Sequence, residues 1–211
     1  MDYLKTTPPG LLIPKVTLLI VAGAVAVALF PQYAPWLIYD RSAILSGEFW
    51  RMFTGHWVHF SLRHLVYDVV PLGIVGWIIE TRRLPRLGWF CAIAPWAISA
   101  VLLIFEPNMM FCGGLSGLAT AAIVYLALWG LSDPAPWRWI CAVTLLVLSA
   151  KIAFELVAGR TLLGTFDGAG IAVSVASHIA GASTALVFYA ASRTNPASRA
   201  SFAQISPEQH A

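Results

Sequence analysis

The sequence predicts an all-α, polytopic membrane protein with six transmembrane helices. Of its 211 residues, 59% are hydrophobic and 11% are charged, whereas a soluble domain carries roughly 25% charged residues. Mean hydropathy is +0.76. The apolar residues gather in six stretches, and a helix needs roughly 20 such residues to cross a bilayer. The net charge of +3 comes without a long basic run, so nothing indicates a nucleic-acid partner. Three cysteines on separate stretches imply no disulfide framework.

Polar or Gly/Pro-containing segments separate the six stretches. They cover about 14–30, 60–79, 87–105, 115–131, 137–158 and 171–192. The first has no convincing cleavage site, so we expect a retained helix rather than a signal peptide. An aromatic-rich loop over 47–57 suits the membrane interface between the first two helices. We therefore predict one membrane domain over 14–193, a cytoplasmic segment over 1–13 and a disordered cytoplasmic tail over 194–211.

The basic residues predict cytoplasmic N- and C-termini, because cytoplasmic loops carry an excess of Lys and Arg. With the N-terminus inside, eight basic residues face the cytoplasm and three lie in outer loops: Lys5, Lys15, Arg82, Arg83, Arg86, Arg138, Arg193 and Arg199 inside, and Arg41, Arg51 and Arg160 outside. In this orientation, His64, Ser116 and His178 all lie near the outer ends of their helices. Polar residues at one depth on three helices indicate a water-filled cavity that opens to the outside.

Ser116 and His178 are the residues that suggest chemistry. Ser116 lies in the sequence Gly-Gly-Leu-Ser-Gly over 113–117, and His178 lies in the last apolar stretch. Polar residues at membrane depth are usually functional, and a serine beside a base is a nucleophile. Gly117 and Gly181 each begin a small-xxx-small pair that lets helices approach closely. We predict the nucleophile and base of a serine hydrolase built inside the bilayer.

His64 and Asp68 are predicted to support this site. They are four residues apart and so share a helix face. A neutral His64 could donate a hydrogen bond to a developing oxyanion. Asp68 could act as a protonated donor, could fix the tautomer of His64, or could orient His178 as a third catalytic member. A purely structural His64–Asp68 pair is the alternative.

Other charged residues are expected to be structural. We expect Arg51 to hold backbone carbonyls of the interfacial loop. Glu80 is expected to mark a solvated inner boundary of the second helix. Lys151 and Glu155 lie four residues apart, so we expect them to pair with each other.

Four motifs together resemble the rhomboid intramembrane serine proteases over about 46–193. They are Phe-Trp-Arg-Met-Phe-Thr (49–54), His-Phe-Ser-Leu-Arg-His (59–64), Gly-Leu-Ser-Gly (114–117) and His-Ile-Ala-Gly (178–181). The resemblance implies a rhomboid-like bundle and a Ser116–His178 dyad without metal or other cofactor. It also implies an oxyanion hole formed by His64 and the Ser116 N–H, with Gly114 beside them. Substrate helices would enter laterally from the lipid bilayer.

Some features depart from the common rhomboid pattern and resemble its rhombosortase branch. Asp68 stands where rhomboids usually carry asparagine, and Ala185 where a second glycine is expected. The short chain and Lys-Ile-Ala-Phe-Glu-Leu over 151–156 point the same way. This resemblance implies a bacterial inner-membrane protease. Its substrates would be exported, membrane-anchored proteins ending in a Gly-Gly motif, a transmembrane helix and a basic tail.

Two other functions remain open from the residues alone. The first is a zinc-dependent membrane hydrolase, whose candidate ligands are His56, His59, His64, Asp68 and His178. The spacing argues against a zinc site, because His59 and His64 are five residues apart and would be turned about 140° from each other on a helix. His59, His64 and Asp68 would then not share one face. The second is a non-catalytic protein that binds transmembrane helices, although such rhomboid relatives lack the serine or the histidine that this chain keeps.

Overall fold

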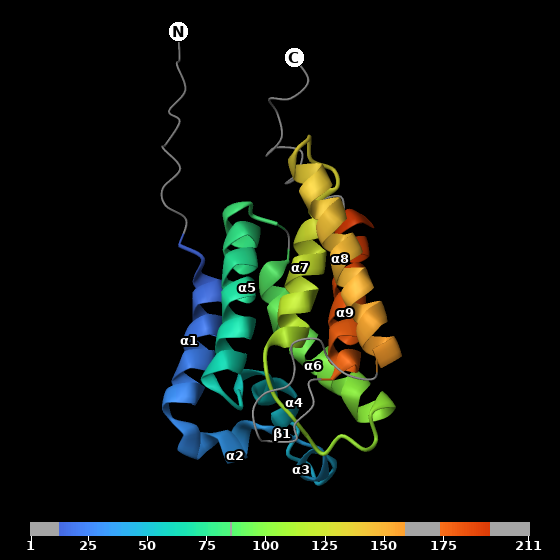
Figure 1. Cartoon of the computed structure of the whole chain (residues 1–211). Helices are drawn as coiled ribbons and strands as arrows, with labels where there is room; N and C mark the ends of the chain where they lie inside the picture. Colours follow the sequence, from blue (N-terminus) through green and yellow to red (C-terminus); the bar gives the residue numbers. More distant parts are fainter. Residues whose placement is uncertain (1–12, 85, 159–173, 195–211) are drawn as a thin grey trace.

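Six long helices run up and down through the protein, in a computed structural model that describes residues 13–84, 86–158 and 174–194 (Figure 1). They are α1 (Lys15–Leu29), α5 (Leu62–Thr81), α6 (Leu87–Phe105), α7 (Ser116–Gly130), α8 (Trp137–Ala158) and α9 (Val175–Thr194). Each predicted stretch corresponds to one of these helices within a few residues. Most of the predicted terminal segments, 1–12 and 195–211, lie outside the described residues.

The long connection between α1 and α5 folds into short elements at one end of the bundle (Figure 1). It contains η1 (Pro31–Tyr33), α2 (Ala34–Leu37), β1 (Tyr39–Asp40), α3 (Arg41–Leu45), α4 (Arg51–Thr54) and η2 (Gly55–Trp57). Strand β1 pairs antiparallel with β2 (Phe111–Cys112), and Tyr39 lies opposite Cys112. Because β2 comes shortly before α7, this pairing fixes the connection against the start of α7.

The apolar helices make this a multi-pass membrane protein. Four helices, α5, α6, α8 and α9, are long and apolar enough to cross a bilayer. A fifth span results if α1 is taken with the bent segment that follows it, at an angle of 92°. Helix α7 has 15 residues, which corresponds to roughly 22 Å at 1.5 Å per residue. The expected count of six complete crossings therefore stays a prediction.

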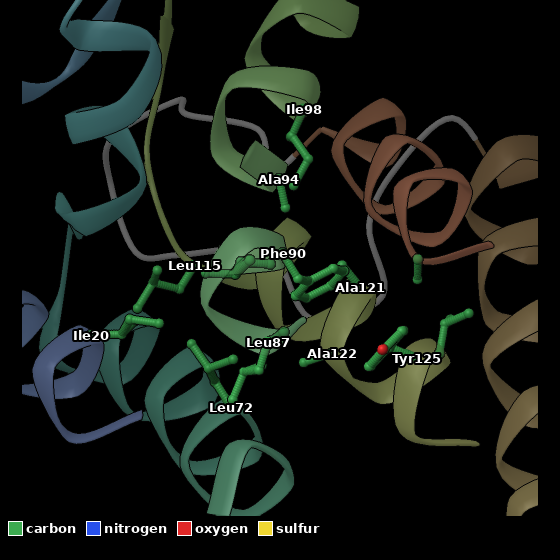
Figure 2. Close-up of a cluster of buried hydrophobic side chains, with 14 of the residues drawn as sticks. Ile20, Leu72, Leu87, Phe90, Ala94, Ile98, Leu115, Ala121, Ala122 and Tyr125 are labelled. Atoms are coloured by element: carbon green, nitrogen blue, oxygen red, sulfur yellow. The ribbon is translucent and has the colours of Figure 1, made fainter. Parts of the chain in front are cut away.

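Helix α7 lies at the centre of the bundle, between α5 on one side and α8 and α9 on the other (Figure 1). Most of its residues are buried, and many are alanine or glycine. Figure 2 shows Ala121, Ala122 and Tyr125 of α7 within the apolar cluster. The Tyr125 ring stacks on Phe90 of α6 with centroids 5.2 Å apart. Small residues let the neighbouring helices come close to α7, which therefore holds its first residue, Ser116, in a defined place.

Glu80 caps helix α1 from the end of α5. Its carboxylate accepts hydrogen bonds from Val16 N at 3.1 Å, Thr17 N at 2.7 Å and Thr17 Oγ1 at 2.6 Å. The first N–H groups of a helix have no intrahelical partner, and a negative charge there is favourable. Glu80 is half-buried, so the expected solvated boundary is not contradicted, but the residue also joins the first two long helices.

Arg51 holds the connection between α1 and α5 together from within. Its side chain is buried, and Nη1 donates to Pro35 O at 2.8 Å and Ile38 O at 3.1 Å. Its Nε also donates to Glu48 Oε2 at 2.6 Å. The planar guanidinium presents several donors in a fixed geometry, which suits such a cluster of acceptors. The predicted role of Arg51 as an anchor for backbone carbonyls is confirmed.

Candidate active site

Ser116 and His178 lie at the starts of two adjacent helices. Ser116 is the first residue of α7, and His178 lies in the first turn of α9 with 5% of its surface exposed. Both helices begin at the end of the bundle that carries α2–α4 (Figure 1). The chain turns into α7 through Gly114, whose φ of +108° strongly favours glycine. The sequence thus places a hydroxyl and an imidazole at a similar depth on one side.

The backbones of α7 and α9 touch directly beside these two residues. A Cβ atom on Gly181 would collide with the Gly117 carbonyl oxygen and would lie 3.4 Å from Ala121 N. A Cβ atom on Gly117 would lie 3.1 Å from Ser177 O. Close packing of these helices through Gly117 and Gly181 was predicted, and it is confirmed. Gly117 and Ser177 immediately adjoin Ser116 and His178, so the contact brings the two helix starts together.

His178 is held by two charged residues of α8. Its Nδ1 lies 3.2 Å from Glu155 Oε2 and 3.3 Å from Lys151 Nζ. Lys151 also donates to Glu155 at 2.8 Å, which confirms their predicted pairing. Within the described residues, no hydrogen bond joins His178 to Ser116. The contact between Glu155 and His178 was not foreseen, although a buried carboxylate in an apolar helix is a signal of function.

Asp68 lies between two histidines. Its Oδ2 is 3.3 Å from His64 Nε2 and 3.2 Å from His59 Nε2. The shared helix face of His64 and Asp68 is as predicted. A Cβ atom on Gly114 would lie 2.8 Å from Asp68 Oδ2 and 2.8 Å from His64 Cε1. The backbone that leads to Ser116 therefore packs against this pair, which puts His64 and Asp68 beside the start of α7.

One ring nitrogen of His59 contacts a backbone carbonyl, and the other faces Asp68. Its Nδ1 lies 3.1 Å from Trp57 O, and because a carbonyl oxygen only accepts, Nδ1 must carry a hydrogen. Its Nε2 is therefore the nitrogen that faces the Asp68 carboxyl, 3.2 Å from Oδ2.

The sequence argument that His59 lies on a different face from His64 and Asp68 was wrong. It assumed one continuous helix, but α5 begins at Leu62, and His59 precedes it in a turn. The remaining candidate ligands lie elsewhere: His56 contacts Pro95 O and Ser99 Oγ, and His178 contacts Glu155. Among the described residues, no group of three or more His, Cys, Asp or Glu is arranged to hold a metal ion.

Burial shifts the pKa values of His56 and Cys112, which lie outside the long helices. Burial lowers the pKa of His56, so this ring is neutral and its Nε2 donates to Pro95 O at 3.0 Å. Burial also raises the pKa of the Cys112 thiol to about 12, so it stays protonated at neutral pH. A thiol is a poor nucleophile compared with a thiolate. Cys112 therefore does not compete with Ser116 as a nucleophile.

Comparison with known proteins identifies the family. The family model described as Rhomboid domain matches residues 46–194. The chain belongs to the rhomboid family. It is 30% identical over 154 residues to the rhomboid protease GlpG from two strains of Klebsiella pneumoniae. That match includes 72% of this chain and 51% of each relative, so the chain spans about half the length of these curated relatives.

The α7–α9 contact of this rhomboid protein is tested by the change Gly181→Ala. The added methyl group meets the Gly117 carbonyl, so we expect the helices to separate, the melting temperature to fall and any reactivity of Ser116 to be lost. Gly88→Ala is the matched control, because a Cβ atom there has nothing within 4 Å. Thermal unfolding and labelling of Ser116 in detergent measure both effects. Equal behaviour of the two variants would contradict the close packing.

Proposed function

We propose that this protein is an intramembrane serine protease in which Ser116 is the nucleophile and His178 the general base. The observation that carries the proposal is the backbone contact of α7 with α9. It brings together the starts of the two helices that carry the hydroxyl and the imidazole, at the same end of the bundle. A nucleophile and a general base are the two groups that acyl transfer requires. Membership of a family that includes rhomboid proteases supports the same conclusion.

The proposed reaction proceeds in two steps. His178 takes the proton of Ser116 Oγ as the oxygen attacks the scissile carbonyl, and it then passes this proton to the leaving amine. Water, activated by His178, next hydrolyses the acyl-enzyme and restores the serine. The distance between the two side chains need not be short beforehand, because catalytic hydrogen bonds often tighten only when substrate binds. No cofactor takes part in these steps.

We propose that the oxyanion is stabilised where α7 begins. The Ser116 N–H is among the first N–H groups of the helix, which have no intrahelical partner, and the helix dipole favours negative charge there. His64 supplies a second donor, and Gly114 allows the chain to pass close to it. Asp68 supports His64. In this proposal a proton shared by His59 and Asp68 leaves the pair without net charge, so that it does not repel the oxyanion as an isolated carboxylate would.

We further propose the setting and substrate class. The protein lies in a bacterial inner membrane with both termini cytoplasmic, and its site opens to the outside through the end that carries α2–α4. This connection lies half in the outer leaflet. The substrates are exported, membrane-anchored proteins with a C-terminal Gly-Gly motif, a transmembrane helix and a basic tail. Support comes from the distribution of basic residues and from the resemblance of Asp68 and the 151–156 segment to the rhombosortase branch.

The first prediction concerns the dyad. Ser116→Ala and His178→Ala should each abolish peptide cleavage while the protein stays folded, because one removes the nucleophile and the other its base. A fluorophosphonate probe should label the wild-type protein and Ser183→Ala, a control on the α6-facing side of α9, but not Ser116→Ala. Labelling that persists in Ser116→Ala would reject this nucleophile. Biological activity that survives Ser116→Ala would favour a helix-binding role.

The second prediction concerns Asp68. An asparagine can still donate a hydrogen bond to His59 Nε2 without adding charge, whereas alanine leaves both histidines without this partner. We therefore expect Asp68→Asn to keep substantial activity and Asp68→Ala to lose at least about tenfold, as for the removal of a group supporting an oxyanion donor. Labelling rates of the two variants provide the measurement. Equal losses would favour an ionised Asp68.

The third prediction concerns the substrate. A reporter with a Gly-Gly motif, a transmembrane helix and a basic tail should be cleaved by the wild-type protein and not by Ser116→Ala. The same reporter with Ala-Ala in place of Gly-Gly should be cleaved much more slowly. Mass spectrometry of the released fragment locates the cut and shows whether water or an amine took up the acyl group. Equal cleavage of both reporters would argue against a Gly-Gly sorting signal.

A further inference from the structure

We infer that Glu155 is a positioning residue that orients His178, so that the site works as a Ser–His–Glu triad rather than a dyad. The inference rests on the proposed function of Ser116 and His178. Helix α8 is the most exposed of the long helices, and Cys141 and Glu155 are its buried residues. A glutamate with 0% of its surface exposed, on a helix that otherwise faces outward, needs a specific reason to be there.

The reason lies in the partners of its carboxylate. Glu155 accepts from Lys151 Nζ at 2.8 Å and faces His178 Nδ1 at 3.2 Å. A buried carboxylate is costly to desolvate, and only charge pairing together with good hydrogen bonds offsets that cost. Lys151, which is partly exposed, supplies the opposite charge and keeps Glu155 ionised. His178 Nδ1 faces Oε2 of the same carboxylate, the oxygen to which Lys151 also donates.

An ionised Glu155 determines the tautomer of His178. A carboxylate only accepts hydrogen bonds, so the ring nitrogen that faces it, Nδ1, carries the hydrogen. In a neutral imidazole, Nε2 then has the lone pair, which is what a base for Ser116 requires. Lys151 Nζ, 3.3 Å from Nδ1, would favour the opposite tautomer if it donated to an unprotonated Nδ1, but its shorter hydrogen bond, at 2.8 Å, goes to Glu155. The ring is therefore fixed in the tautomer that the proposed reaction needs.

The same carboxylate stabilises the charge that arises during reaction. When Nε2 takes the proton of Ser116, His178 becomes an imidazolium, and Glu155 lies in contact with it without itself becoming protonated. This matters here because Lys151 is also near and would otherwise oppose a second positive charge. Before proton transfer, the side chains of Lys151, Glu155 and His178 together carry no net charge. After proton transfer, they carry a single positive charge.

Asp68 was the residue that the sequence offered as a third member, and the geometry favours Glu155. Asp68 contacts His59 and His64, whereas His178 contacts Glu155. Among the described residues, no hydrogen bond or ion pair joins Asp68 to His178. The two acids thus contact different histidines. Asp68 supports His64 on the side of the proposed oxyanion, and Glu155 supports His178, the proposed base.

The first test reads the tautomer directly and does not depend on activity. The full-length protein carrying Ser116→Ala is labelled with ¹⁵N in its histidine rings and studied by NMR in detergent, and His178→Gln assigns the signals. We expect hydrogen on Nδ1 and none on Nε2 of His178, and a change of this pattern in Glu155→Gln. A hydrogen on Nε2 in the protein with Glu155 intact would overturn the inference, whether or not the protein is a protease.

The second test measures rates with the fluorophosphonate probe. Loss of the acid from a serine-protease triad lowers kcat by on the order of 10⁴, so Glu155→Gln should lower the rate at saturating probe at least about tenfold. The concentration for half-maximal rate should change little, because the probe itself does not touch Glu155. Glu155→Asp, which keeps the charge, should recover part of the rate.

Glu80→Gln is the matched control for a structural role. It makes the same chemical change to a carboxylate that accepts three hydrogen bonds from α1. We expect it to lower the melting temperature and to leave the labelling rate of the folded fraction and the His178 signals unchanged. If Glu155→Gln lowers only the melting temperature in the same way, Glu155 is structural and the inference fails. Absence of labelling in the wild-type protein would instead reject the proposed function alone.

Discussion

The contact between the backbones of α7 and α9 is the constraint on which the candidate site depends. Helices with ordinary side chains at their interface have axes roughly 8–10 Å apart, and small residues at the contact allow a closer approach. Gly117 and Gly181 remove those side chains, and the carbonyl of Gly117 fills the space where a Cβ atom on Gly181 would lie. The lipid provides little force to press helices together, so this close packing supplies the attraction itself.

Buried and half-buried charges in this protein connect different elements. Glu80 on α5 binds the start of α1, Arg51 binds the carbonyls of Pro35 and Ile38, and Glu155 on α8 binds His178 on α9. Each charged group is satisfied by a partner distant in sequence, because leaving it unpaired in an apolar surrounding would be costly. The interactions that remove this cost therefore also fix the positions of the helices relative to one another.

The candidate site is divided between two histidine–carboxylate groups on opposite sides of the start of α7. On one side, Asp68 lies between His59 and His64, next to Gly114. On the other side, Glu155 and Lys151 hold His178. The β1–β2 pairing fixes the chain just before Ser116. In the proposed mechanism, a serine that begins a helix between these groups has its base on one side and its oxyanion donors on the other.

The six helices, their order and the close α7–α9 packing were determined by the sequence itself, because length, apolarity and small-residue spacing are local properties. So was the i, i+4 pairing of Lys151 with Glu155. The tertiary structure alone decided which residues on other segments His59, Glu80 and Glu155 contact. His59 reaches Asp68 because α5 begins only at Leu62. Glu80 contacts the start of α1, and Glu155 on α8 contacts His178 on α9. Periodicity shows which face of a helix a residue occupies, but not which neighbouring helix lies against that face.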